Sequence, residues 1–176
     1  MSKEETKLLP TEMTEKSSPT FVETEKLFDK LAEITKEIAA RAFDFFMDRG
    51  SQFGDHFEDW LKAESEILRA APAKITETKG IVNVMVSVPG FKAEEIEVSV
   101  KDDLLIVSGE TKSDEQKEVE STYYNEWKSD RFMRKLLLPS AVDRAGIEAS
   151  LNDGVLKLLL KKKAEVEAVK AAVKAA

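Results

Sequence analysis

The feature that most constrains the fold is a pair of short β-prone runs near the C-terminal end of the chain. Ile147, Ala149 and Leu151 alternate with polar residues, which is the period of a strand with one buried face. The segment 152–154, Asn-Asp-Gly, separates this run from the apolar residues 155–160. Asp-Gly favours a tight turn because glycine adopts a positive φ at little steric cost. The pattern therefore predicts an antiparallel hairpin.

Similar alternation continues upstream of this hairpin. The runs 74–78 and 81–88 are separated by Lys-Gly, a second hairpin signal, and 95–100 places its apolar residues on one face. Further strands are expected at 104–108 and 131–139. Repeated short strands with turn residues between them are typical of an antiparallel β-sandwich.

The segment before these strands has the period of helices. An apolar stripe follows steps of three and four residues and comprises Leu27, Leu31, Ile34, Ile38, Ala42 and Phe45. Thr20 with Glu23, and Asp55 with Glu58, have the spacing of capping boxes at the start of two helices. Gly50 is expected to end the first helix and Pro72 to stop the second. Because the link between them is short, we expect an antiparallel helical hairpin over 20–71.

The composition excludes several classes of protein. The chain has 176 residues and no cysteine, so disulfides, thiolate metal sites and cysteine nucleophiles are excluded. The formal net charge of −7 argues against affinity for nucleic acid or for an anionic membrane. The N-terminus lacks the apolar core of a signal peptide, and no apolar run is long enough to cross a bilayer, so a soluble cytoplasmic protein is expected. Residues 1–19 are polar and predicted to be a flexible tail.

The sequence contains few residues that could act in catalysis. His56 is the only histidine, and it is expected on the surface in the first turn of a helix. Neither a glycine-rich phosphate loop nor a Gly-x-Ser-x-Gly elbow is present. The acidic pairs 94–95 and 102–103 fall at turn-like positions, where solvated turn residues are the better interpretation. We therefore expect neither an enzyme nor a bound cofactor or metal.

The spacing from Ala149 to Gly154-Val155-Leu156 resembles the signature of the α-crystallin domain of small heat shock proteins, the Hsp20 family. Leu138-Pro139 and the blocks 88–92 and 105–110 fit the same family, so the resemblance covers roughly 75–160. It implies an immunoglobulin-like antiparallel β-sandwich over 72–161, followed by a C-terminal extension, 162–176. Residues 34–68 also resemble a small bacterial helical module of unassigned function, which supplies no activity.

The resemblance implies a strand-exchanged dimer. In bacterial, plant and archaeal relatives, the loop corresponding to 111–128 carries a small strand that pairs with the sheet of the partner subunit. The aromatic alternation in this loop is consistent with that role, and the alternative is a flexible hairpin that folds on its own subunit. The expected interface residues are Tyr123, Tyr124, Trp127, Phe132 and Arg134. For Arg134 the alternative is an exposed surface charge.

The resemblance also implies a groove for an extended peptide. Its expected walls comprise Ile96, Val98 and Val100 on one strand, and Ile147, Ala149 and Leu151 on the other. In the family an Ile-x-Ile or Val-x-Val tripeptide of the C-terminal tail fills this groove. Here 162–176 lacks a clear tripeptide of that kind and favours a short amphipathic helix. The sequence leaves open whether the strand 147–151 is open to clients or covered by the N-terminal helices.

Aromatic residues of the helical segment form a second candidate binding surface. Phe43, Phe46 and Phe53 are expected to lie exposed together, as residues that bind non-native proteins. Three other aromatic residues of this segment are expected in the core of the helical hairpin: Phe45, Phe57 and Trp60.

As the resemblance implies, the expected function is that of an ATP-independent holdase chaperone. It would bind partly unfolded proteins, limit their aggregation and pass them to ATP-dependent chaperones. The alternative is a non-catalytic adapter or co-chaperone whose helical module recognises one specific folded partner. The expected building block is a homodimer, with a higher-order state smaller or differently organised than is usual in the family.

Overall fold

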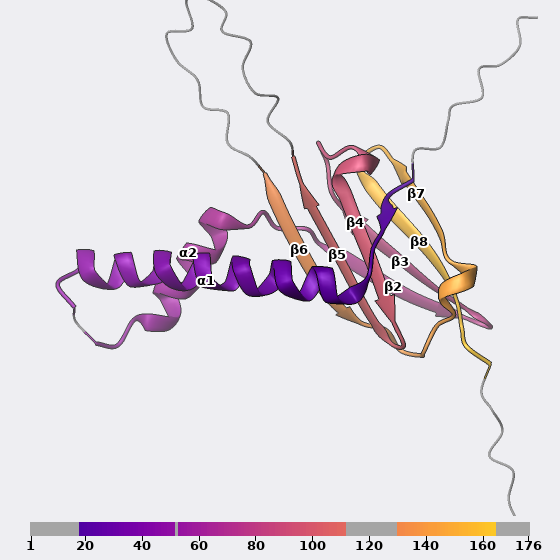
Figure 1. Cartoon of the computed structure of the whole chain (residues 1–176), viewed down its shortest axis with the longest axis horizontal. Helices are drawn as coiled ribbons and strands as arrows, with labels where there is room; N and C mark the ends of the chain where they lie inside the picture. The colour runs from indigo at the N-terminus through magenta and orange to yellow at the C-terminus, as the bar shows by residue number, and fades with distance from the viewer. Residues whose placement is uncertain (1–17, 52, 112–129, 165–176) are drawn as a thin grey trace, which may run out of the picture.

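The chain forms a β-sandwich with a helical hairpin attached to one face (Figure 1). The computed structural model describes residues 18–51, 53–111 and 130–164. Sheet A has the strand order β1 (Thr20–Phe21), β4 (Ile96–Lys101), β5 (Leu104–Glu110) and β6 (Arg131–Leu137). Sheet B has the order β2 (Ala73–Thr78), β3 (Ile81–Ser87), β8 (Val155–Lys161) and β7 (Glu148–Asn152). The predicted antiparallel sandwich is confirmed, with one parallel pair, β1 with β4.

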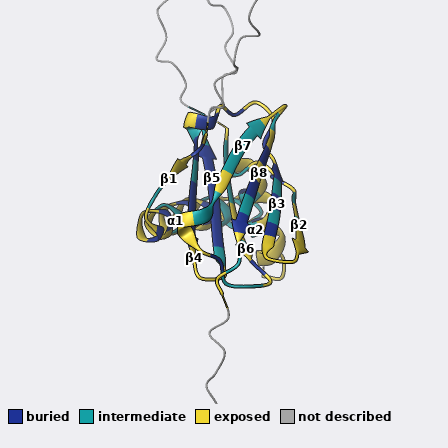
Figure 2. Cartoon of the chain, turned by 90° about the vertical axis from the view of Figure 1, so that its right-hand side faces the viewer, coloured by how far each residue is buried: buried dark blue, intermediate teal, exposed yellow. Residues whose placement is uncertain are grey.

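The core lies between the two sheets and is built by the alternation seen in the sequence. Its buried members include Val82, Val84, Val86, Ile96, Val98, Leu105, Val107, Phe132, Leu156 and Leu158. In β8 buried residues alternate with exposed ones, because the outer face of sheet B meets solvent (Figure 2). In β5 five consecutive residues are buried. Both faces of sheet A are therefore covered at β5, and the covering element on the outer face is the first helix.

The predicted hairpin at the C-terminal end is confirmed. β7 pairs antiparallel with β8, with Ala149 opposite Leu158. The turn between them places Asp153 at φ 48° and Gly154 at φ 72°. A Cβ atom on Gly154 would lie 2.7 Å from the Cα atom of Pro89, so glycine is required here for space as well as for conformation.

The two helices form an antiparallel hairpin. α1 spans Thr24–Asp48 and α2 spans His56–Ile67. Arg49 pairs with Asp59, and Arg41 pairs with Glu66, so later residues of α1 contact earlier residues of α2. Ile34, Ile38 and Ala63 form the buried centre between the helices. Partly buried residues pack around them, namely Ala42, Phe45, Trp60, Ile67, Leu68 and Met133 of β6.

The start of the first helix differs from the prediction. Thr20 lies in β1, and α1 begins only at Thr24, after Glu23 as N-cap. The backbone of this segment is used by the sheet, because the N–H of Val22 donates to the carbonyl of Val98 at 3.0 Å. Neither helix has a side-chain hydrogen bond at its N-cap, so both predicted capping boxes are wrong. The carboxylate of Asp55 instead faces Arg49, 3.5 Å away.

Three predicted segments cannot be compared with the structure. The tail 1–17, most of the loop with Tyr123, Tyr124 and Trp127, and the C-terminal helix after residue 164 lie outside the described residues. Among the residues that are described, neither helix combines the length and the apolar character needed to span a lipid bilayer.

Candidate functional site

The six predicted groove residues all belong to the sandwich core or pack against it. Ile96, Val98 and Val100 of β4 and the hydrophobic residues of β7 belong to or pack against the same core cluster. The β4 residues are at most 2% exposed, whereas Ile147, Ala149 and Leu151 are partly buried. β4 and β7 thus form the two margins of the predicted groove, one on each sheet. Whether a partner binds between them stays a prediction.

A short N-terminal strand lies along the β4 margin of this groove. β1 pairs in parallel with β4, with Thr20 beside Glu97 and Phe21 beside Val98. Paired residues in neighbouring strands point to the same side of a sheet, so Phe21 lies on the side of the sheet where Val98 enters the core. Ser18 and Phe21 line one pocket together with Ile147, the β7 residues 148–150, and Lys157 and Leu159, which lie on the outer face of β8. The N-terminal segment therefore spans the space between β4 and β7.

Sequence reasoning missed this strand. Pro19 is followed by Thr20, Phe21 and Val22, which are β-branched or aromatic residues. This is the only local signal for extended backbone, and it is too short to show a period of two. The prediction extended the helix over these residues instead.

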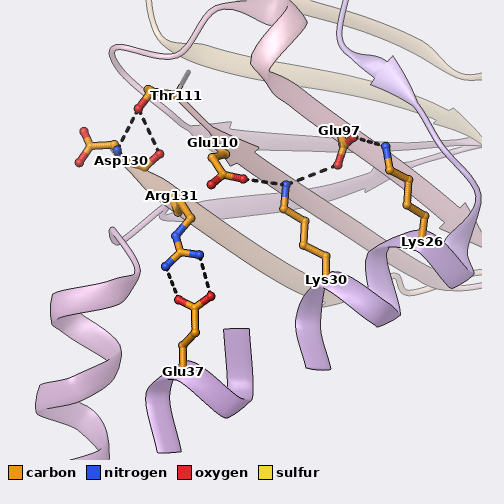
Figure 3. Close-up of polar contacts among 8 residues, drawn as sticks. All are labelled: Lys26, Lys30, Glu37, Glu97, Glu110, Thr111, Asp130 and Arg131. Carbon is orange, nitrogen blue, oxygen red and sulfur yellow. Dashed lines mark hydrogen bonds and ion pairs between the residues drawn. The ribbon is translucent and has the colours of Figure 1, made fainter. Parts of the chain in front are cut away.

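The first half of α1 is fixed to the outer face of sheet A by polar contacts around Glu97 (Figure 3). Lys26 donates from Nζ to Oε1 of Glu97 at 2.6 Å. Lys30 lies between two carboxylates, 3.6 Å from Glu97 and 3.5 Å from Glu110. The helix is thus connected to both β4 and β5 by its lysines.

Beneath these charges, small buried side chains allow the helix to approach the sheet. The hydroxyl oxygens of Thr24 and Ser99 are 2.7 Å apart in a buried hydrogen bond. Leu27 of α1 and Ile106 of β5 are both fully buried although neither belongs to the sandwich core. α1 contacts β4 and β5 here, and Met133 of β6 adds a further apolar contact beside Ile34 and Ile38.

A second contact lies farther along α1. Arg131 of β6 donates from both terminal nitrogens to the carboxylate of Glu37, at 3.2 Å and 2.5 Å. This bidentate geometry is the strong form of an ion pair. Next to this ion pair, the N–H of Asp130 donates a hydrogen bond to the hydroxyl of Thr111 at 2.9 Å (Figure 3). This bond connects the two residues that flank the segment 112–129.

The two carboxylates that hold α1 have lowered pKa values. Burial alone raises the pKa of Glu97, but the hydrogen bond from Lys26 and the charge of Lys30 outweigh it, so the net shift is downward. The hydrogen bond from Arg131 lowers the pKa of Glu37. Both groups are therefore charged at neutral pH.

The predicted aromatic patch lies at the end of the helical hairpin that is distant from the sandwich (Figure 1). The ring centroids of Phe43 and Phe46 are 6.0 Å apart, and those of Phe46 and Phe53 are 5.8 Å apart. Phe43 is 59% exposed and Phe53 is 95% exposed, while Phe46 is partly buried. We call these three residues the aromatic patch.

The predicted burial of Phe57 is wrong. This residue was expected in the hairpin core with Phe45 and Trp60, which are indeed partly buried there. Phe57 is instead 66% exposed. It lies in the first turn of α2, where α1 has already ended and no facing helix surface remains to cover it.

The two predicted interface residues that can be compared with the structure lie on β6 and differ in burial. Phe132 is 1% exposed and packs edge-on against Phe91, with ring centroids 4.9 Å apart. Its side chain therefore belongs to the core of its own chain. Arg134 is exposed, and it forms no ion pair with any residue of the described ranges. The role of both residues in a dimer stays a prediction.

Within the described ranges, no group of three or more His, Asp or Glu side chains is arranged to hold a metal ion. His56 is exposed at the first position of α2, as predicted. The described residues offer an exposed cluster of aromatic rings, and a pocket between Phe21 and residues 147–150.

Comparison with known families matches two parts of the chain. Residues 74–174 match the profile of the Hsp20/alpha crystallin family. Residues 33–69, which contain most of the helical hairpin, match a family of proteins of unknown function, DUF2934. The predicted resemblances of both segments are thereby confirmed.

Individual relatives agree with the first match. The chain is 38% identical over 102 residues to a 17.6 kDa class II heat shock protein of Arabidopsis thaliana, covering 56% of this chain and 65% of the relative. It is 34% identical over 113 residues to a 17.3 kDa class II heat shock protein of Solanum peruvianum, covering 60% of this chain and 73% of the relative. Spore protein SP21 of Stigmatella aurantiaca is 34% identical over 94 residues, covering 53% and 56%. The chain thus spans from about half to three quarters of the length of these relatives.

Solved structures of similar proteins include heat shock protein 16.0 from Schizosaccharomyces pombe, at 26% identity and a TM-score of 0.45, covering 61% of this chain and 99% of that one. A small heat-shock protein from Xylella fastidiosa is 26% identical with a TM-score of 0.43, covering 61% and 98%.

Proposed function

The chain belongs to the Hsp20/alpha crystallin family, and from this membership we propose that it is an ATP-independent holdase. It binds partly unfolded proteins and suppresses their aggregation. The mechanism is mass action, because capture of exposed apolar surface lowers the free concentration of the aggregating species. Clients released from it pass to ATP-dependent chaperones, and the protein acts in the cytoplasm.

The observation that carries this proposal is the aromatic patch. Phe43 and Phe53 are both more than half exposed, although each large apolar side chain moved out of water gains about 1.5–3 kcal/mol. Monomeric proteins rarely expose such groups side by side unless the surface binds something. Rings on a helix pair and its connecting loop can contact many sequences, because apolar contact has little directional requirement.

Light scattering of a heated model client tests the holdase activity. Wild-type protein at an equimolar subunit ratio is expected to suppress aggregation. The double variant Phe43→Ser/Phe53→Ser is expected to lose most of this effect. The matched control is Ile81→Ser/Val155→Ser, which removes two exposed apolar side chains from the sandwich and should retain full activity. Undiminished aggregation with wild type would count against the holdase, and equal loss in both variants would count against the patch.

A second candidate function is that of an adapter or co-chaperone that binds one folded partner. It is favoured by the match of residues 33–69 to a family of its own, since a separate module with its own buried centre is suited to a dedicated partner. Pull-downs from unstressed and heated cells distinguish the two functions. A single stoichiometric native partner at both temperatures supports the adapter, whereas a heat-dependent mixture supports the holdase.

For assembly we propose a dimer in which the loop 111–128 pairs with the sheet of the partner, with Tyr123, Tyr124 and Trp127 at the contact. Arg134 supports this proposal, because an exposed arginine at a sheet edge is suited to bidentate pairing with a carboxylate of a second chain. Native mass spectrometry of the full chain is expected to give even-numbered species. The variant Arg134→Glu is expected to shift them to monomer, whereas Lys135→Glu on the same strand should not. Odd-numbered species in the wild type would contradict the dimer.

A further inference from the structure

Carboxylates surround the aromatic patch, and their charge indicates which proteins the patch can bind. We propose that it selects non-native segments in which lysine or arginine alternates with apolar residues, and that it disfavours acidic segments. This inference rests on the holdase function proposed above and adds the chemical class of the client.

The end of the helical hairpin that carries the patch is strongly acidic. Residues 43–59 contain five acidic residues and one basic residue, Arg49, so this short segment holds more than half of the chain's net charge of −7. Four of these acidic residues are exposed, namely Asp44, Asp48, Asp55 and Glu58. Within the part of the chain that the structure describes, Asp48 and Glu58 form no ion pair. A client therefore approaches the rings through a negative potential, which attracts cations and repels anions.

Two of these carboxylates occupy positions that do not favour the helix itself. Asp44 and Asp48 lie in the last two turns of α1, where the helix dipole favours cations. Their i, i+4 spacing also places two like charges side by side, which destabilises a helix. Residues that violate such local rules are expected at functional sites. A cation bound beside Asp44 and Asp48 relieves both effects.

The hairpin already holds one of its own cations between a ring and carboxylates. The guanidinium of Arg49 lies over the ring of Phe46, 5.4 Å from the ring centroid. The same guanidinium pairs with Asp59 at 2.5 Å and lies 3.5 Å from Asp55. Attraction between a cation and the face of an aromatic ring is thus combined with ion pairing at one side of the patch.

The outward rings of the patch differ from the inward ring of Phe45 in this respect. The Nζ atom of Lys62 is 3.9 Å from the ring centroid of Phe45, and the guanidinium carbon of Arg41 is 4.3 Å from it. Among the described residues, no lysine or arginine takes such a position over Phe43 or Phe53. Both rings are more than half exposed, so a lysine or arginine of a client can lie over them.

A second copy of this chain is the alternative occupant of the patch. In that contact the exposed carboxylates of the two copies would face each other, and like charges across an interface disfavour association. A cationic apolar segment meets the same carboxylates with opposite charge and the same rings with apolar side chains. Charge complementarity therefore favours the cationic client over the second copy.

Peptides of matched apolar content test this selection. The probe is a peptide with phenylalanine, leucine and four lysines separated by glycine and serine, labelled with an uncharged fluorophore. Its binding to the full chain is measured by fluorescence anisotropy, and two further peptides carry glutamine or glutamate in place of each lysine. At about 0.1 M salt the lysine peptide should bind about tenfold more tightly than the glutamine peptide, because each exposed ion pair or cation–π contact contributes a factor of about two to five. The glutamate peptide should bind more weakly than both. At about 1 M NaCl, where the Debye length is about 3 Å, the three affinities should agree within about twofold.

Variants of the full chain locate the selection at the patch. Asp44→Asn/Asp48→Asn should weaken binding of the lysine peptide about threefold to tenfold and leave the glutamine peptide unchanged. The matched control is Asp29→Asn/Glu33→Gln, because these residues are exposed, have the same spacing on α1 and form no ion pair with a described residue. They precede Phe43 by at least ten residues, about 15 Å along a helix, which exceeds the Debye length of about 10 Å at 0.1 M salt. The control should bind the lysine peptide as wild type does.

The variant Phe43→Ser/Phe53→Ser separates failure of this inference from failure of the holdase. It should weaken binding of all three peptides. If wild type bound the lysine and glutamine peptides equally, and both were lost in this variant, the selection of cations would be overturned and the holdase would stand. If wild type bound none of the peptides and left a heated client to aggregate, the holdase and the selection would both be overturned.

Two further results would overturn the selection. Equal weakening by Asp44→Asn/Asp48→Asn and Asp29→Asn/Glu33→Gln would mean that the net charge of the whole chain acts, and not the carboxylates at the patch. The other result is a larger oligomer in native mass spectrometry of Asp44→Asn/Asp48→Asn with unchanged peptide binding, since the patch would then be a contact between copies.

Discussion

Glu97 is the residue through which the attachment of α1 can be measured. Replacing it by glutamine keeps the size of the side chain and removes the charge that Lys26 and Lys30 face at 2.6 Å and 3.6 Å. A hydrogen bond to a charged group contributes about 1.5–3 kcal/mol, and an exposed ion pair about 0.2–1 kcal/mol. Because Lys26 is 60% exposed, we expect a loss near the lower end, about 1–2 kcal/mol, which is about a 5–30-fold shift toward the detached helix.

Hydrogen exchange of backbone amides measures this shift in the intact chain. In Glu97→Gln, protection in residues 28–33 should fall by the factor just given, whereas residues 40–45 should be unchanged because α2 holds them. Glu94→Gln is the matched control, since Glu94 is an exposed carboxylate next to β4 without an ion pair in the described ranges. Unchanged exchange in 28–33, or an equal rise in both segments, would refute the reasoning.

The lowered pKa of Glu97 sets the pH at which the same contact is lost. The group contributes stability above the unfolded pKa of a glutamate, about 4.3, and this contribution disappears as the pH falls through the lower folded pKa. The pKa of Glu37 is lowered by the hydrogen bond from Arg131, so its contribution to stability is also lost as the pH falls. We expect the difference in exchange between wild type and Glu97→Gln to be full at neutral pH and to vanish in acid. A difference that persists unchanged in acid would contradict the assignment to charge.

Three further substitutions test the packing that positions the binding surfaces. Gly109→Ala places a Cβ atom 2.2 Å from the ring of Phe132, so urea unfolding should show a loss of about 1–3 kcal/mol. Gly154→Ala combines a positive φ with a clash against Pro89 and should lower the free energy of unfolding by more than the about 1–2 kcal/mol of the conformation alone. Ile38→Ala should cost about 2–5 kcal/mol, seen as early loss of helical circular dichroism on heating.

The sandwich could be predicted because its signals are local. Alternation in 147–151 places Ala149 and Leu151 against the core whichever strand lies opposite, and the glycines at 80 and 154 determine where the chain reverses. Once both hairpins are in place, the inner faces can only be buried against each other. The family resemblance added the order of the strands, which alternation cannot supply.

β1 could not be predicted because it depends on a contact far along the chain. Thr20 and Phe21 become a strand only because the edge of β4 lies next to them in the folded protein. Two residues have no period, and the Thr20–Glu23 spacing favoured a helix start more strongly. The contacts of Lys26 and Lys30 with Glu97 were missed for the same reason, since charged side chains on a helix indicate only a solvated face.

The exposed aromatic residues of the helical hairpin were predicted in part, and the failure has a geometric cause. A stripe on a helix indicates which side is buried, but it does not indicate where along the helix the covering partner ends. Phe45 faces α2, whereas Phe57 extends beyond the end of α1 and stays exposed. Helix ends therefore determine which rings stay exposed, and these depend on the linker at 49–55.

α1 is attached by two kinds of interaction that respond differently to salt. Near its middle, α1 packs through Ile34 and Ile38 against α2 and Met133 of β6, and apolar contacts of this kind are not weakened by salt. The first turns of α1 combine the buried Leu27 and the Thr24–Ser99 hydrogen bond with the ion pairs of Lys26 and Lys30, and salt screens only the ion pairs. A rise in ionic strength should therefore weaken the attachment of these first turns without detaching them, while the helical hairpin that carries the aromatic patch keeps its structure.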